Sequence, residues 1–224
     1  MPNEVIFLIL AAVDLFFIFL VARRAPEWLF GTIITNFFLI SLFGAKLVTL
    51  FGMTTNAGNV FYACIFFATY FIFVYRGKKV AKKSVVFGAV FMLLFGTLTL
   101  LTTLLPGNAA SSVVNNALSM LFSFSPRVMI ASVVAYIFAQ YINIFVFDWV
   151  VSRTKGAQYL LAANVANAVG QAIDSTIFFS IVFFDLPGPL LVQAIAVGWL
   201  CKVAVVALGT PLLAADAHLS RGKV

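Results

Sequence analysis

GNVFYACIFFATYFIFVYRGKKVAKK, residues 58–83, joins a continuous apolar run to a cluster of basic residues. The run from 59 to 75 has no charged side chain and approaches the roughly 20 residues that a helix needs to cross the hydrocarbon core of a bilayer. Five lysines and arginines follow between positions 76 and 83. Because such residues concentrate in the cytoplasmic loops of membrane proteins, this segment predicts a transmembrane helix that ends at the cytoplasmic face.

The rest of the chain has the same character. Of its 224 residues, 63% are hydrophobic and only 9% are charged, and the mean hydropathy is +1.12. Soluble domains average about 45–50% apolar and about 25% charged residues. The sequence therefore predicts an all-α polytopic membrane protein, with residues 1–224 as one transmembrane domain and a bundle of about seven transmembrane helices. The predicted spans are 5–22, 28–51, 59–75, 84–105, 127–150, 159–184 and 190–213.

The loop charges predict how this bundle is oriented. Eleven of the fourteen lysines and arginines follow the first, third, fifth and seventh runs, and the opposite connections contain none. We therefore expect a multi-pass protein of the cell membrane, surrounded by the lipid bilayer, with its N-terminus outside and its C-terminus in the cytoplasm. The long connection 106–125 is expected to be an ordered external loop, or a loop that leads into a short interfacial or re-entrant helix. The net charge of +7 comes from the clusters, so a nucleic acid is not an expected partner.

Patterns typical of catalysis and of metal binding are missing from the sequence. It contains no H-E-x-x-H, no Walker A sequence and no Cys/His metal spacing, and its single histidine is His218. Cys64 and Cys201 lie inside apolar runs, where a disulfide framework is not expected. We therefore expect neither enzymatic activity nor a cofactor or bound metal.

Two predicted spans carry stripes of polar side chains. At about 100° per residue, four polar residues of span 159–184 fall within about 80° of one another, and three of span 127–150 fall within about 60°. The stripes are Asn164, Asn167, Gln171 and Asp174 in one helix and Tyr136, Gln140 and Asn143 in the other. Such residues can hold helices together by hydrogen bonds, or they can line a path for a solute. The carboxylate favours the solute path, because helix association does not require it.

The remaining charges are expected to face a protein interior or the interface. Asp14 and Lys46 are candidates for a structural ion pair between the first two spans. Arg127 can reach the outer interface from the start of its span. Lys202, near the middle of the last span, has Asp174 as its most attractive partner.

The polar side chains suit a small solute that is neutral or cationic. Amides offer donors and acceptors to the edge of a planar heterocycle, and Asp174 can pair with a ring N–H or an amine. Tyr136 or Trp199 can stack on the flat face of such a ring. Asn59, at the outer start of span 59–75, is expected to line the entrance.

Four segments of the chain, in the same order, resemble the queuosine precursor transporter family, also called the putative vitamin uptake transporter family. They are 58–83, quoted above, PRVMIASVVAYIFAQYINIFVF at 126–147, NVANAVGQAIDSTIFF at 164–179 and LCKVAVVALGTP at 200–211. The resemblance implies import of a 7-deazaguanine precursor of queuosine across the cytoplasmic membrane. It implies substrate-binding roles for Asn59, Gln140, Gln171, Asp174 and Lys202.

The chain departs from the pattern of this family at four positions where members carry acids. These positions hold Tyr70, Val74, Asn143 and Gly209. Fewer acids favour facilitated diffusion with trapping in the cell over ion coupling, and they allow a different heterocycle as cargo. The alternatives are a substrate-binding subunit for another vitamin or heterocycle that needs an energising partner, and a membrane scaffold that transports nothing. As partners, the sequence leaves open a second copy of the chain, in a homo-oligomer, or an energising protein.

Overall fold

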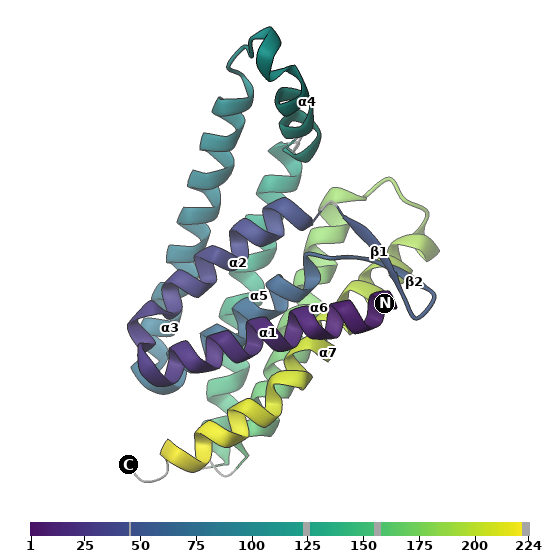
Figure 1. The fold of residues 1–224 in the computed structure, drawn as a ribbon. Helices are drawn as coiled ribbons and strands as arrows, with labels where there is room; N and C mark the ends of the chain where they lie inside the picture. Colours follow the sequence, from purple (N-terminus) through teal and green to yellow (C-terminus); the bar gives the residue numbers. More distant parts are fainter. Residues whose placement is uncertain (45, 123–125, 155–157, 221–224) are drawn as a thin grey trace.

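The computed structural model describes residues 1–44, 46–122, 126–154 and 158–220, which fold mainly into α-helices (Figure 1). In chain order the elements are α1 (Asn3–Arg24), a 3-10 turn (Pro26–Trp28), α2 (Leu29–Phe43), β1 (Leu47–Leu50), β2 (Met53–Asn56), α3 (Asn59–Thr103), a second 3-10 turn (Ala109–Ser111), α4 (Ser112–Leu121), α5 (Pro126–Arg153), α6 (Tyr159–Val182) and α7 (Gly188–Ser220). Six helical segments among these residues are long and apolar enough to cross a membrane. The protein is therefore an all-α polytopic membrane protein, as predicted.

Helix α3 is folded back on itself at Gly77. Going along the Pro26–Phe43 segment from its N-terminal end, the contacting residues have falling numbers in the first half of α3 and rising numbers in its second half. The two halves of α3 are therefore antiparallel. The contacts are Glu27 with Arg76, Phe43 with Phe61, Phe30 with Phe87 and Phe38 with Phe95. Gly77 has φ 81° and ψ 168°, a conformation that is essentially restricted to glycine. The predicted spans 59–75 and 84–105 therefore meet at one residue, and positions 78–83 are helical.

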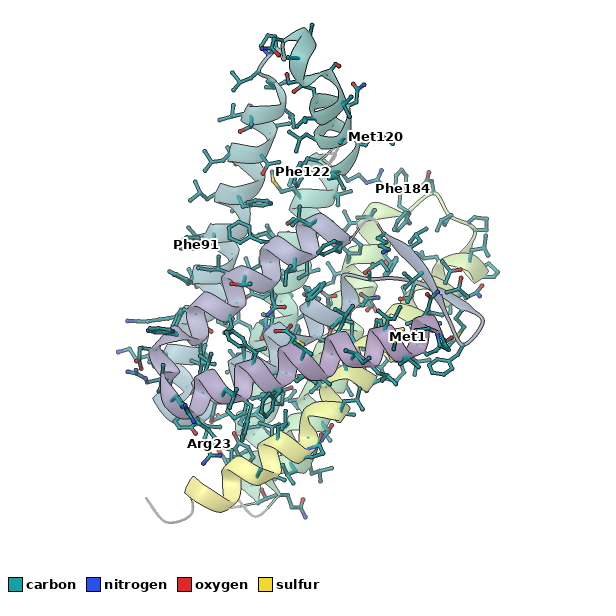
Figure 2. The ribbon with its side chains drawn as sticks, viewed as in Figure 1. Met1, Arg23, Phe91, Met120, Phe122 and Phe184 are labelled. Carbon is teal, nitrogen blue, oxygen red and sulfur yellow. The ribbon has the colours of Figure 1, made fainter. Side chains whose placement is uncertain are left out.

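The first half of α3 lies at the centre of the molecule, between the other long helices (Figure 1). Every residue from Ala63 to Ile72 is buried. A helix that is apolar on all sides belongs in the core of a large bundle, and the long aromatic run of the opening segment provides such a helix. The second half of α3 and α1 expose many large apolar side chains, which suits a surface in contact with lipid. Figure 2 shows side chains along α1 and the second half of α3 that project outward from the ribbon.

The prediction that one span extends from 28 to 51 was wrong at its end. Helix α2 ends at Phe43, and β1 and β2 form an antiparallel hairpin with Leu50 opposite Met53. Phe51 and Gly52 both have positive φ, which is the pattern of a two-residue type I′ turn. A short apolar run does not by itself distinguish a helix from a strand, and here the glycine turn decides the outcome.

The hairpin is tied to the N-terminal end of α1. The backbone N–H of Phe51 donates to Glu4 Oε1 over 2.8 Å, and Asn3 Nδ2 donates to the carbonyl oxygen of Thr49 over 3.2 Å. On the predicted external connection, α4 is a ten-residue helix. Its exposed apolar side chains include Val113 and Met120. A short helix in this connection is thus confirmed, and its position at the membrane interface stays a prediction.

Candidate functional site

A buried ion pair joins α6 to α7. Lys202 Nζ lies 2.5 Å from Asp174 Oδ2 and 3.3 Å from Ser175 Oγ, and both charged side chains are buried. This is the pair that the sequence predicted. The other carboxylate oxygen, Asp174 Oδ1, accepts a hydrogen bond from the Tyr62 hydroxyl of α3. The Lys202 ammonium also lies 4.7 Å from the centre of the Tyr62 ring, so three helices meet around one neutral pair of charges.

Sequence analysis did not identify Tyr62 as a site residue. It lies in a run that contains five phenylalanines and three tyrosines between positions 61 and 75, so its spacing carries no distinguishing signal. Aromatic residues in such a run are usually core residues. Only the position of α6 against α3 shows that this hydroxyl meets a carboxylate.

Next to the ion pair is a cluster of buried polar side chains on α5 and α6. It consists of Tyr136, Gln140 and Asn143 on α5 and of Asn167 and Gln171 on α6. All five have no exposed surface. Eight of their side-chain nitrogen and oxygen atoms have no hydrogen-bond partner among the described residues. We call these five residues the amide cluster.

Helices α5 and α6, which carry the amide cluster, are antiparallel. Arg127 Nε donates to the carbonyl oxygen of Ile181 over 2.7 Å at one end, and the rings of Phe147 and Tyr159 are 5.1 Å apart near the other end. A Cβ atom at Gly170 would lie 3.1 Å from the carbonyl oxygen of Ala139, so the middle of α5 lies beside the middle of α6. The stripe residues are buried, apart from the half-buried Asn164, so they turn inward as the sequence predicted. That the two stripes share one chamber stays a prediction, and the Tyr136 hydroxyl lies beside Gly88 of α3, where an added Cβ would be 2.6 Å away.

A glycine brings α5 and α6 into close contact beside the cluster. A Cβ atom at Gly170 would lie 3.0 Å from Asn143 Cβ and 3.0 Å from Phe66 Cε1. Small residues of this kind let membrane helices approach closely. The helices thus enclose the amide cluster in this conformation. A groove of about 570 Å³ lies on another face of the molecule, lined by Lys79, Lys82 and their neighbours.

Three other predicted site residues have partners outside the amide cluster. Asn164 is half-buried, and its Nδ2 donates to Thr210 Oγ1 of α7 over 3.0 Å and to the carbonyl oxygen of Leu160 over 2.9 Å. Asn59 is buried, and its Nδ2 donates to Thr55 Oγ1 of β2 over 2.8 Å. Trp199 Nε1 donates to the carbonyl oxygen of Ala168 over 2.9 Å. These contacts hold elements together, which is the structural role that the sequence left open for polar residues.

The predicted ion pair between Asp14 and Lys46 was wrong. Asp14 Oδ1 accepts from Asn36 Nδ2 over 3.4 Å, whereas Lys46 is exposed beside the hairpin. The unexpected end of α2 explains the difference, because Lys46 lies beyond that helix. Arg127 is exposed, and its guanidinium lies over the ring of Phe184, 4.0 Å from the ring centre. Its place at the outer interface stays a prediction.

Two of the positions where the resemblance implies acids contact each other. The Tyr70 hydroxyl lies 2.7 Å from Asn143 Oδ1 and 2.9 Å from the carbonyl oxygen of Ala163, so its single proton can bond to either acceptor. At a third such position, a Cβ atom on Gly209 would lie 2.6 Å from the ring of Phe67. A side chain at position 209 therefore requires Phe67 to move.

Comparison with known proteins gives two matches. A family model described as "Putative vitamin uptake transporter" matches residues 56–215. A curated protein of Bacillus subtilis (strain 168), "Probable queuosine precursor transporter", is 31% identical over 189 residues, which cover 81% of this chain and 78% of the relative. No solved structure matches this chain.

Proposed function

Because the chain belongs to the putative vitamin uptake transporter family, we propose that this transporter imports a small planar heterocycle of the 7-deazaguanine class across the cell membrane. Its site in this proposal is the amide cluster together with Asp174 and Lys202. The name of the bacillar relative supports the class of cargo, and the chemistry of the buried side chains supports the location of the site.

The observation that carries the proposal is the set of eight unpaired polar atoms in the amide cluster. A buried polar group without a hydrogen bond costs about 1–3 kcal/mol, and protein interiors rarely leave several together. If these side chains served only to join helices, they would bond to one another, as Asn164 does with Thr210. A polar solute between the stripes would supply the partners instead.

The donors and acceptors of the site suit a neutral purine-like ring. Each glutamine or asparagine can donate from its nitrogen and accept at its oxygen, which matches an edge where N–H groups and ring nitrogens alternate. Asp174 accepts from an amine or ring N–H, and Lys202 donates to a carbonyl oxygen. Because these two residues already neutralise each other, a neutral cargo leaves the buried charge balanced.

The contact at Gly170 gives this mechanism a conformational step. A solute would reach the amide cluster after α6 moves away from α5 or from α3, because α6 touches both helices at Gly170 beside the cluster. Opening toward one side of the membrane and then toward the other would carry the solute across. This sequence of motions is the alternating access of secondary transporters.

Uptake of a radiolabelled 7-deazaguanine precursor, in a host that cannot make it, tests the proposal. Gln171→Met keeps the size of the side chain and removes its hydrogen-bonding atoms, so we expect uptake to fall at least about tenfold. The matched control is Thr176→Val, at an exposed position of the same helix, and it should transport normally. Equal amounts of both proteins in the membrane must be verified by immunoblot.

Two results would change the conclusion. Normal uptake by Gln171→Met would remove the amide cluster from the transport path. Uptake by cells, but not by liposomes that contain only the purified chain, would favour the alternative of a substrate-binding subunit with an energising partner.

A further inference from the structure

A groove with a cationic end and an apolar end lies on the outer face of α3 and α5. It is a shallow groove, largely open to the surroundings, with a volume of about 570 Å³, and its lining is mostly apolar. The lining residues are Lys79, Lys82, Lys83, Val86, Phe87, Val90 and Tyr141. Tyr141 follows Gln140 in sequence, but it is turned by about 100° around α5 and so faces away from the amide cluster. The proposed transport path makes no use of this groove.

The lysines of the groove have no acidic partners among the described residues. Two neighbouring basic residues do have acidic partners: Lys78 Nζ lies 2.6 Å from Asp148 Oδ2, and Arg76 lies 3.5 Å from Glu27. Lys79, Lys82 and Lys83 are all exposed. Three adjacent ammonium groups repel one another, so an anion bound between them would be stabilised by all three.

The apolar end of the groove continues along the same face of the helix. Positions 79, 82, 83, 86, 87 and 90 follow the spacing of three and four residues that marks one helical face. From Lys83 to Val90 the helix rises by about 10 Å, away from the basic turn at Gly77 and toward the middle of the predicted span. The face is therefore cationic near the membrane surface and apolar at greater depth.

We propose that this groove binds an anionic phospholipid, with its phosphate between the three lysines and an acyl chain along Val86, Phe87 and Val90. Basic pockets between membrane helices on the cytoplasmic side recognise acidic headgroups in this manner. The loop charges assign the lysines to that side. A free phosphate would engage the lysines alone and would leave the apolar end of the groove unused.

Lipid binding to the purified full-length chain tests this proposal. Native mass spectrometry can count phosphatidylglycerol and phosphatidylcholine molecules that stay bound as the detergent is removed. The triple variant Lys79→Gln, Lys82→Gln, Lys83→Gln should bind phosphatidylglycerol at least about tenfold more weakly than the unmodified chain. The matched control, Arg23→Gln, Arg24→Gln, Arg153→Gln, removes the same charge from the same predicted side and should keep the affinity.

A second variant tests the apolar end without changing any charge. The double variant Val86→Ser, Val90→Ser should weaken the binding of phosphatidylglycerol and should leave the weak binding of glycerol phosphate unchanged. Three results would each overturn the proposal. They are an equal loss of phosphatidylglycerol affinity in the arginine control, an equal affinity for phosphatidylcholine, and glycerol phosphate binding as tight as that of the lipid. These experiments measure lipid binding and not transport. Failure of the lipid-binding proposal can therefore be distinguished from failure of the proposed function.

Discussion

Asp174 and Lys202 stabilise the folded protein only as a pair, because each charge is buried and needs the other as its partner. Their 2.5 Å contact is closed off from water by α3, α6 and α7, with the Tyr62 hydroxyl on the second carboxylate oxygen. A buried charge whose partner is removed costs several kcal/mol, whereas removing both charges together can cost little. The structural contribution of the pair and its proposed role in transport can therefore be separated by experiment.

A double-mutant cycle makes that separation. We expect Asp174→Asn and Lys202→Met each to lower the free energy of unfolding by about 3–5 kcal/mol, and the double variant to lose much less than their sum. Unfolding of the purified chain in detergent measures this, and uptake should be lost in all three variants. Transport restored in the double variant would show that the charges serve stability alone.

The control for this cycle is the pair of Lys78 and Asp148. It has a similar contact distance of 2.6 Å, but its side chains are 42% and 32% exposed. Exposed ion pairs contribute about 0–1 kcal/mol, so Lys78→Met and Asp148→Asn should each have a small effect. A loss of several kcal/mol in either of these variants would mean that burial does not explain why the Asp174–Lys202 pair is sensitive to mutation.

At the residue scale, sequence reasoning found the right side chains but could not assign their partners. A helical projection gives the angle of each residue around its own helix, and this was enough to predict that Gln140, Gln171 and Asp174 turn inward. It does not say what lies opposite. Asn164 shares the stripe, yet it meets Thr210, and Tyr62 meets Asp174 from a run that looks entirely like core.

At the scale of elements, Gly77 provides the turn at which α3 reverses its direction. Gly77 lets two helical halves run antiparallel with no intervening loop, and only its backbone conformation distinguishes it from a helical residue. The predicted spans on either side were close to the observed ones, because length and hydropathy define a membrane helix well. The end of α2 was missed because a turn, and not composition, ends that helix.

Gly77→Ala tests the role of this turn. An alanine with φ near 81° is strained, so we expect a loss of about 1–3 kcal/mol in the free energy of unfolding, measured by thermal denaturation in detergent. Gly31→Ala is the matched control, since a Cβ at Gly31 of α2 meets no atom within 4 Å. That control should be neutral or slightly stabilising, because alanine favours helix. Equal effects of the two changes would contradict the assigned role of the turn.

At the scale of the whole molecule, the apolar exterior and the basic end define how the protein sits in a membrane. Large apolar side chains cover α1 and the outer half of α3, and the basic turn at Gly77 lies at the same end as Glu27 and the start of α2. The sequence predicted this arrangement, because hydropathy and loop charge act along the chain. The enclosed site could not be derived in the same way, because it depends on contacts between distant helices.

Cysteine labelling tests the predicted orientation. In a chain with Cys64→Ala and Cys201→Ala, an impermeant maleimide added to intact cells should label Ser112→Cys and should leave Ser152→Cys unlabelled. Both serines are exposed, so both variants should react after permeabilisation. The reverse pattern in intact cells would place the N-terminus in the cytoplasm.

The central position of the first half of α3 has a consequence for biogenesis. The ribosome makes this segment before α5, α6 and α7, so during translation its aromatic side chains first meet lipid and are later covered by protein. Tyr70 gains its acceptors, Asn143 and the carbonyl oxygen of Ala163, only when those later helices have been inserted. Until those helices are in place, the Tyr70 hydroxyl lacks the two acceptors that it has in the folded protein.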